Sequence, residues 1–490
     1  MRTLSALIFI VLVSACSTAK KKQQDRINAA YDARTEAQRN QPTARPADSQ
    51  LGGRTMPSTE AGNLPRTGAA SGDTRSSAQS PAPVKVMTDG PALGTTPAIS
   101  AKTTGEWMVT SIKGKFLAVD TTSVRVYMNL TAKTPTGDPV TNPNDFAEHF
   151  TIAYVMYPDY NNRDRLGYGT VPLNAQSIAQ EGDHLTLTFD VKRPKDAATA
   201  VLLTEITEAN SGTKARNDLP LRFKATKLSE RFTLFDKTGK QPQLRNYVNV
   251  GDTVIIGDVN GTGKPLFGVR YHHDFDAASS PMNTTSRPTT RSLTVDSTLT
   301  INTNQPFIIP RDGLYYFVED TTAESGIGLL VTDKRFPKLT RPEKLIKPVL
   351  YMSTSSEIGE LNQAQDTKKA FDRYWLGLMS GNEAVAKKTI KAYFDRVEEA
   401  NRLFTTYKEG WKTDKGMIYI VLGAPDRVQR NREREVWVYN RRANVSEVNF
   451  TFTKKANQFV DDHYELVRYI EYQPIWYPIV EAWRTGAIRE

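Results

Sequence analysis

Hydrophobic and polar residues alternate with a period of two over many short stretches of the chain. In SVRVYMNL, every second residue from Val124 to Leu130 is apolar, so the apolar side chains share one face of an extended strand. Asp, Gly, Asn and Pro residues separate such runs, as they do in antiparallel sheets. We predict a β-sandwich over residues 106–228. Its expected strands are 123–130, 149–157, 185–191 and 219–225.

A second group of short apolar runs predicts another sandwich-like domain over residues 229–352. The glycine-rich stretch DVNGTGKPL, residues 258–266, lies between two of these runs. It lacks a Ser or Thr after Lys264, and it connects two strands, so it does not fit a phosphate-binding loop. We interpret it as a hairpin turn. The expected strands are 231–235, 252–259, 265–273, 292–301, 305–310 and 314–320.

From residue 353 to residue 490 the pattern predicts a small α+β domain. Helical periodicity begins at Ser355 and ends near Gly381, and a second helix follows up to Tyr407. Asn382 is a suitable N-cap for this second helix, and Gly410 is a suitable stop in a left-handed conformation.

The rest of this domain is expected to form an antiparallel sheet. MIYIVLG is apolar throughout, and over residues 417–422 it predicts a central strand covered on both faces. Residues 448–469 predict a hairpin in which Phe450 and Phe452 share a face. The expected fold is therefore two all-β sandwich-like domains followed by a helix pair on a small antiparallel sheet, preceded by a disordered tether.

The N-terminus has the pattern of a lipoprotein signal peptide. An apolar run from Leu4 to Val13 is too short to span a bilayer, and VSAC, ending at Cys16, resembles a lipobox. Cys16 is the single cysteine of the chain. We predict a signal peptide over residues 1–15 and acylation of Cys16, which attaches the chain to a membrane without a transmembrane helix. Disulfides and catalytic thiols are then excluded downstream.

Residues 16–105 form the predicted tether. The stretch is rich in Ala, Thr, Ser, Pro and Gly, and residues 17–104 contain twelve Lys or Arg against seven Asp or Glu. The second mature residue is not aspartate, which by resemblance to lipoprotein sorting rules indicates the outer membrane. The absence of an acidic cluster after Cys16 indicates its periplasmic face. Membrane and envelope proteins are the expected partners, and nucleic acid is not.

The stretch EGWKTDKGMIYIVLGAPDRV, residues 409–428, carries the most specific motif. Its GWKTD, residues 410–414, together with GAPD at 423–426 and EVWVYN at 435–440, resembles the GWxTD-domain proteins of Bacteroidetes-type bacteria. The resemblance covers roughly residues 355–490. It implies an envelope lipoprotein with β domains ahead of this module, and it implies no agreed reaction.

The motif itself has a structural and a chemical interpretation. In the structural one, Thr413 or Asp414 bonds the turn and Trp411 covers a helix–sheet junction. In the chemical one, paired carboxylates hydrolyse a glycosidic bond. Adjacent His272 and His273 point to opposite faces of a strand, so we expect a surface loop rather than a metal site. No cofactor is expected. The carboxylates that could carry out the hydrolysis of a glycosidic bond are Asp414, Asp426, Asp461, Asp462 and Glu465.

Two functional hypotheses follow. The first is a non-enzymatic, lipid-anchored accessory subunit whose arginines and tryptophans bind an envelope protein. An outer-membrane assembly or secretion complex is the setting we consider for it. The second is a binder or hydrolase of an envelope glycan such as peptidoglycan or lipopolysaccharide. The interaction surface expected under the first hypothesis consists of Trp411, Arg430, Arg432, Trp437, Trp476 and Trp483.

Overall fold

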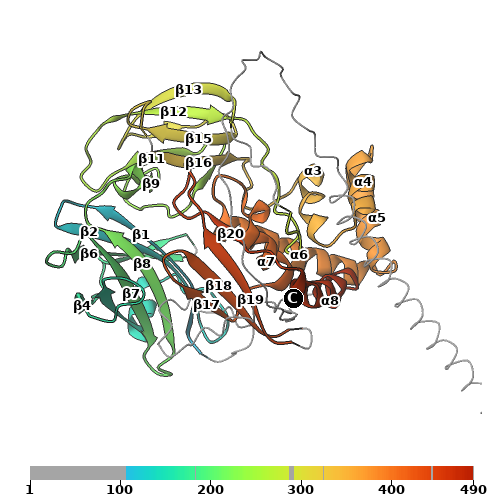
Figure 1. The fold of residues 1–490 in the computed structure, drawn as a ribbon, viewed down its shortest axis with the longest axis horizontal. Coiled ribbons are helices and arrows are strands. Elements are labelled where there is room, and N and C mark those ends of the chain that lie inside the picture. The colour runs from blue at the N-terminus through green and yellow to red at the C-terminus, as the bar shows by residue number, and fades with distance from the viewer. Residues whose placement is uncertain (1–105, 183, 286–291, 324, 443–444, 489–490) are drawn as a thin grey trace, which may run out of the picture.

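The computed structural model describes residues 106–182, 184–285, 292–323, 325–442 and 445–488. Figure 1 shows two β-rich regions, drawn in blue to yellow, and a C-terminal region of helices and one sheet in orange to red. This arrangement confirms the predicted fold class. The predicted signal peptide, Cys16 and the tether lie outside the described residues.

The first β unit is a sandwich of two four-stranded antiparallel sheets. One sheet has the order β1-β2-β6-β5 and the other β4-β3-β7-β8. The alternation in SVRVYMNL predicted the inward face correctly, because Val124, Val126 and Leu130 are all 0% exposed. A short helix, α2 (Pro143–His149), precedes β3. The strands are β1 (Met108–Ala118), β2 (Ser123–Lys133), β3 (Phe150–Tyr157), β4 (Gly167–Thr170), β5 (Ile178–Glu181), β6 (His184–Lys192), β7 (Thr199–Glu208) and β8 (Lys214–Arg222).

The second β unit combines a five-stranded sheet, β10-β16-β15-β12-β13, with a three-stranded one, β14-β11-β9. The prediction of a hairpin at residues 258–266 is wrong. The loop carries the chain from β11 in the smaller sheet to β12 in the larger one, and these two strands do not pair. The elements are η1 (Leu228–Glu230), β9 (Thr233–Phe235), β10 (Tyr247–Asn249), β11 (Thr253–Gly257), β12 (Pro265–Tyr271), β13 (Val295–Asn302), β14 (Phe307–Ile308), β15 (Gly313–Val318) and β16 (Ile327–Thr332).

The C-terminal unit packs its helices against the antiparallel sheet β17-β18-β19-β20 (Figure 1). Asn382 caps α6 as predicted, because its side chain accepts a hydrogen bond from Val385 N. The helical elements are α3 (Pro342–Leu345), η2 (Pro348–Tyr351), α4 (Ser355–Gln363), α5 (Thr367–Leu378), α6 (Glu383–Phe404), η3 (Gly410–Lys412), α7 (Asp414–Leu422), η4 (Ile470–Tyr472) and α8 (Gln473–Arg484). The strands are β17 (Arg427–Arg430), β18 (Arg434–Arg442), β19 (Val445–Lys454) and β20 (Tyr464–Leu466).

The predicted central strand at residues 417–422 is instead the body of helix α7. Every residue from Gly416 to Leu422 is buried, so the helix is surrounded by protein on all sides. A short, continuously apolar segment has the same pattern whether it is a buried strand or a buried helix. Thr413 determines the outcome, because its hydroxyl accepts the Gly416 amide and so caps a helix.

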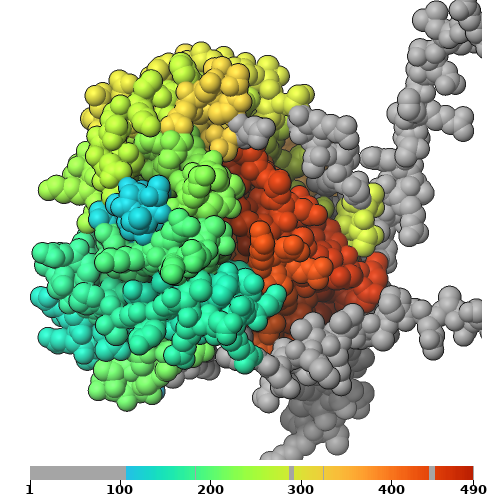
Figure 2. Space-filling model, turned by 60° about the vertical axis from the view of Figure 1, so that its left-hand side comes forward, coloured from blue at the N-terminus to red at the C-terminus, as the bar shows by residue number. Residues whose placement is uncertain are grey.

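The three units pack against one another, as Figure 2 shows on one face of the molecule. Leu117 and Tyr127 of the first unit share a buried cluster with Phe235, Leu244 and Ile255 of the second. The main core of the C-terminal unit likewise includes side chains from the second β unit, such as Tyr247 and Leu330.

Candidate functional site: the GWKTD corner and a cleft between the units

The GWKTD motif forms the corner between α6 and α7. The chain leaves α6 at Phe404 and turns through η3 before α7 begins. Two side chains of the last turn of α6 hold this corner: Thr405 Oγ1 accepts the Gly410 amide at 2.9 Å, and Asn401 Oδ1 accepts the Trp411 amide at 3.0 Å. Backbone donors that would otherwise be unpaired inside the protein are thereby satisfied.

Gly410 is required for space rather than for a left-handed backbone. We expected a positive φ here, but Gly410 is not among the glycines with positive φ, and α6 has already ended. A Cβ atom at Gly410 would lie 2.1 Å from the carbonyl oxygen of Ala400. Glycine therefore allows the corner to pack directly on the backbone of α6.

Thr413 and Asp414 connect the corner to its surroundings. The Thr413 hydroxyl donates to Gly410 O at 2.7 Å while it accepts the Gly416 amide at 3.0 Å. Asp414 accepts the Leu466 amide at 2.7 Å and Arg468 Nη2 at 2.5 Å. The first residue of α7 thus holds the end of strand β20 in place.

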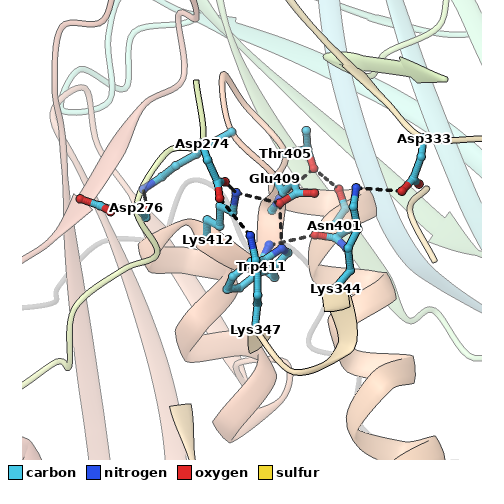
Figure 3. A network of polar contacts seen from close by, with 12 residues as sticks. Asp274, Asp276, Asp333, Lys344, Lys347, Asn401, Thr405, Glu409, Trp411 and Lys412 are labelled. Atoms are coloured by element: carbon cyan, nitrogen blue, oxygen red, sulfur yellow. Dashed lines mark hydrogen bonds and ion pairs between the residues drawn. The ribbon is translucent and has the colours of Figure 1, made fainter. Parts of the chain in front are cut away.

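Trp411 and Lys412 extend the same network, shown in Figure 3. The indole of Trp411 is 3% exposed, its Nε1 donates to Glu409 at 3.1 Å, and its carbonyl accepts the hydroxyl of Tyr351 at 2.7 Å. Lys412 Nζ lies 2.5 Å from Asp274 and 3.0 Å from Glu409. All five motif residues are thus engaged in contacts that hold the corner together.

The Asp274 carboxylate binds the corner to the second β unit. It accepts Lys412 on one oxygen and Lys347 on the other, at 2.5 Å and 2.9 Å (Figure 3). Burial opposes its ionisation, but the hydrogen bonds and charges of the two lysines outweigh that effect and lower its pKa to about 2. The carboxylate is therefore charged at neutral pH and acts as an ionic bridge.

The predicted tryptophan surface does not exist, because these residues are in the core. Trp437 is 3% exposed, Trp476 is 2% exposed and Trp483 is 0% exposed. Trp411 is buried to the same degree, as described above. The Trp483 indole donates to Val421 O at 3.0 Å, which satisfies a carbonyl at the end of α7. Buried indoles stabilise the fold and cannot contact a partner in this conformation.

Arg430 is partly buried and joins the C-terminal unit to the first sandwich. Its Nη1 lies 3.1 Å from Asp218 on β8, and its Nε lies 2.9 Å from Glu435 on β18. Glu435 further accepts the Trp437 indole at 2.6 Å and pairs with Lys415 at 3.1 Å. Burial disfavours the charged form of Glu435, yet Arg430 and Lys415 outweigh it and lower its pKa.

Arg432 is the exposed member of the predicted surface. It follows β17 in the turn to β18 and lines a cleft of about 660 Å³ where the three units meet. Such a volume lies within the range typical of ligand sites. Lys113 and Lys115 of β1, Arg245 of the second unit and the β19–β20 loop of the C-terminal unit contribute to the same wall.

The cleft has an excess of positive charge. Its lining residues include seven Lys or Arg and four Asp or Glu. Lys227 is ion-paired with Asp461, and Lys454 with Asp462 at 2.9 Å. Within the described part of the chain, no carboxylate lies within ion-pair distance of the Lys113 or Lys115 ammonium.

Each candidate carboxylate bonds its own nitrogen donor, and Asp461 and Asp462 alone among the five line the cleft together. Asp426 accepts the Asn440 amide at 2.6 Å. Glu465 lies 3.3 Å from His463 Nε2. Asp461 and Asp462 lie in the cleft with their lysines, whereas Asp414 is part of the corner.

The two adjacent histidines lie in a surface segment, as the sequence predicted. His272 and His273 are exposed directly after β12. Over the described residues, no three His, Cys, Asp or Glu side chains are grouped as a metal ion would require.

Among the residues that the structure describes, no helix has the length and apolar character needed to cross a membrane.

Comparison with protein families identifies a GWxTD domain at residues 313–485 of this chain. The domain was predicted from the motif, and its matched range begins at the first residue of β15. It thus includes β15 and β16 of the second β unit. Comparison with curated proteins gives no match.

Two solved structures have a weak likeness to the chain. Tp47, the 47-kilodalton lipoprotein of Treponema pallidum, has 10% identity and a TM-score of 0.20, over 48% of this chain and 52% of that chain. The full ectodomain of mouse nectin-like molecule 4 has 12% identity and a TM-score of 0.14, over 47% of this chain and 65% of that chain. Both matches span less than two thirds of the other protein, and such TM-scores support no argument about fold or function.

Sequence reasoning did not identify Lys113, Lys115 and Asp218 as site residues. The alternation of lysine and glycine in SIKGKFLA was an available signal, because it places both lysines on one face of β1. The opposing groups, Asp461 and Asp462, come from a loop more than three hundred residues later. Periodicity alone gives no information about such a long-range contact.

Proposed function

We propose that this protein is a non-enzymatic, lipid-anchored subunit of the cell envelope that binds an envelope protein. In this proposal acyl chains on Cys16 hold it at the periplasmic face of the outer membrane, and the folded body binds a component of an assembly or secretion complex. The tryptophans stabilise that body, and the partner contacts the cleft between the three units.

The observation that supports a binding role is the way the cleft is built. Each of the three units contributes to its wall, and ionic contacts such as Asp218–Arg430 and Lys227–Asp461 hold the units in register around it. A preorganised concave site reduces the entropy lost on binding. The GWKTD corner contributes to this order by bonding Asp414 of α7 to Leu466 of β20, the strand that follows the cleft-lining loop.

The glycan hydrolase alternative has less support. The ion pairs with lysines described above engage both aspartates of the C-terminal loop in the cleft. Burial disfavours ionisation of Asp461, but its contacts with Lys227 and Ser229 outweigh this and lower its pKa. A general acid in glycoside hydrolysis requires a raised pKa.

The direct test is to purify the native chain from membranes in mild detergent and to identify what is retained in stoichiometric amount. We expect one envelope protein. A Cys16→Ser variant serves as control, and we expect it to leave the membrane fraction while its folded body is unchanged. Recovery of glycan alone, or of nothing, would contradict the proposal.

A further inference from the structure

The half-buried lysines of β1 are the strongest unexplained feature of the molecule. Lys113 and Lys115 lie two residues apart on the outer face of the first sandwich, next to Leu117, which packs against the second unit. Burial lowers the pKa of Lys113 to about 8, and neighbouring Lys115 and Arg245 add to the effect of burial while Asp462 opposes it. Burial also lowers the pKa of Lys115.

The charges around these lysines do not balance. The charged groups that line the cleft with them are Asp461 and Asp462 from the β19–β20 loop, Lys227 before η1, Arg245 before β10, Lys454 at the end of β19, Arg432 before β18, Asp159 after β3, and Arg222 of β8, which pairs with Glu230 of η1 at 3.1 Å. Lys227 and Lys454 already neutralise the two aspartates. Partly desolvated cations without a close counterion favour the arrival of an anion.

We propose that this cleft binds an acidic segment of a partner protein, in which carboxylates alternate with apolar side chains. The inference rests on the proposed function and deepens it by naming the kind of segment that is bound. Lys113, Lys115, Arg245 and Arg432 receive the carboxylates. Partly exposed apolar side chains from all three units, Pro158, Ile327 and Val460, receive the side chains between them.

The lining favours a peptide over an anionic glycan. Sugar hydroxyls require hydrogen-bonding groups that are not already committed to the protein, and two of the neutral polar groups of the cleft are bonded to neighbouring side chains. The Tyr160 hydroxyl donates to Asp218 at 2.7 Å, and Gln243 Oε1 accepts Arg245 Nε at 3.1 Å. The chain's own tether is disfavoured as occupant, because residues 17–104 contain twelve Lys or Arg against seven Asp or Glu.

The test uses the full lipidated chain in detergent and a short fluorescent peptide in which glutamate alternates with leucine. We expect saturable binding, and we expect the Lys113→Gln/Lys115→Gln double variant to weaken it by at least about tenfold. A Lys368→Gln/Lys391→Gln variant, on exposed faces of α5 and α6, is the matched control and should bind like the wild type. The glutamine version of the peptide should bind at least about tenfold more weakly.

Proton linkage gives a second measurement that does not depend on a variant. Because the charged lysine is needed, affinity should fall as pH rises through the Lys113 pKa of about 8. Exposed lysines would remain charged to about pH 10, so binding through them would persist. Equal binding by the double variant, a pH-independent affinity between pH 7 and about pH 9, or preference for an oligogalacturonate over the peptide would each overturn the inference.

The outcomes also separate this inference from the proposed function. If the native chain retains an envelope partner and the double variant retains it equally, the inference is wrong and the proposed function stands. If the peptide binds as expected and no partner is recovered from membranes, the proposed function fails and the acidic-peptide site stands. Unchanged thermal melting of the double variant shows that it is folded, because removal of two desolvated charges should not destabilise the cleft.

Discussion

Asp218 and Arg430 lie 212 residues apart in the sequence and meet at 3.1 Å between the first sandwich and the C-terminal unit. The Asp218 side chain is 1% exposed and Arg430 is 22% exposed. A second hydrogen bond to Asp218, from Tyr160, leaves the carboxylate well satisfied. This pair holds one wall of the cleft against another, so the relative position of the units depends on it.

Removing Arg430 should therefore uncouple these two units. We expect Arg430→Met to lower the free energy of unfolding by about 3 kcal/mol or more, because it removes the cation paired with buried Asp218 and leaves Glu435 with Lys415 alone as its cationic partner. The matched control is Arg427→Met on the same strand, whose pair with Glu447 is 43% and 44% exposed. That variant should cost less than about 1 kcal/mol. Urea unfolding measures both, and equal effects would contradict the role of Arg430.

Glu435 predicts how stability responds to acid. Its folded-state pKa is lowered, so its contribution is fully present above the ordinary value of 4.5 and is lost as pH falls below that value. We expect Glu435→Gln to be less stable than the wild type at neutral pH and to lose less stability between pH 4.5 and lower pH. Thermal melting over this range measures the effect. Parallel pH profiles for the two proteins would exclude this assignment.

Gly410 should be among the least tolerant positions of the corner. We expect Gly410→Ala to cost about 3 kcal/mol or more, because its new methyl group would overlap the Ala400 carbonyl and the packed helices cannot separate freely. Gly359→Ala in α4 is the control, since a Cβ there meets nothing within 4 Å. That change should stabilise the protein by roughly 0.5–1 kcal/mol through helix propensity. Chemical unfolding of the pair compares them.

The Thr413 hydroxyl separates a cap from simple packing. We expect Thr413→Val, which keeps the shape of the side chain, to lose the cap of α7 and cost about 1–2 kcal/mol. Thr413→Ser keeps the hydroxyl and should remain close to the wild type. If both variants lose equal stability in thermal melting, then the methyl group rather than the cap is what stabilises the corner.

The sequence predicted the layered β architecture because alternation directly reports which face of a strand is buried. It predicted a strand at residues 417–422 because a six-residue apolar run has no period to interpret. In α8, Trp476, Val480 and Trp483 recur at helical spacing, which was a signal that both tryptophans belong to the core. Clustering of tryptophans in the sequence was a weaker guide than this spacing.

The candidate site was harder to predict because it depends on contacts between units. GWKTD was recognisable from local sequence, and its role as a corner followed from its glycine, hydroxyl and carboxylate. The cleft depends on Lys113 from β1, Arg245 from the second unit and Asp461 from the last hairpin. Their proximity results from how the three units dock, for which no single stretch of sequence gives a periodic signal.

The most direct test of the account is photocrosslinking in intact cells from the exposed position of Arg432 in the cleft. A photoreactive residue at 432 should give one major adduct with an envelope protein, through a segment rich in Asp or Glu. The same residue at exposed Lys368 on α5 should give none. An adduct at position 368 but not at 432, or an adduct at 432 that survives the Lys113→Gln/Lys115→Gln change undiminished, would contradict binding in the cleft.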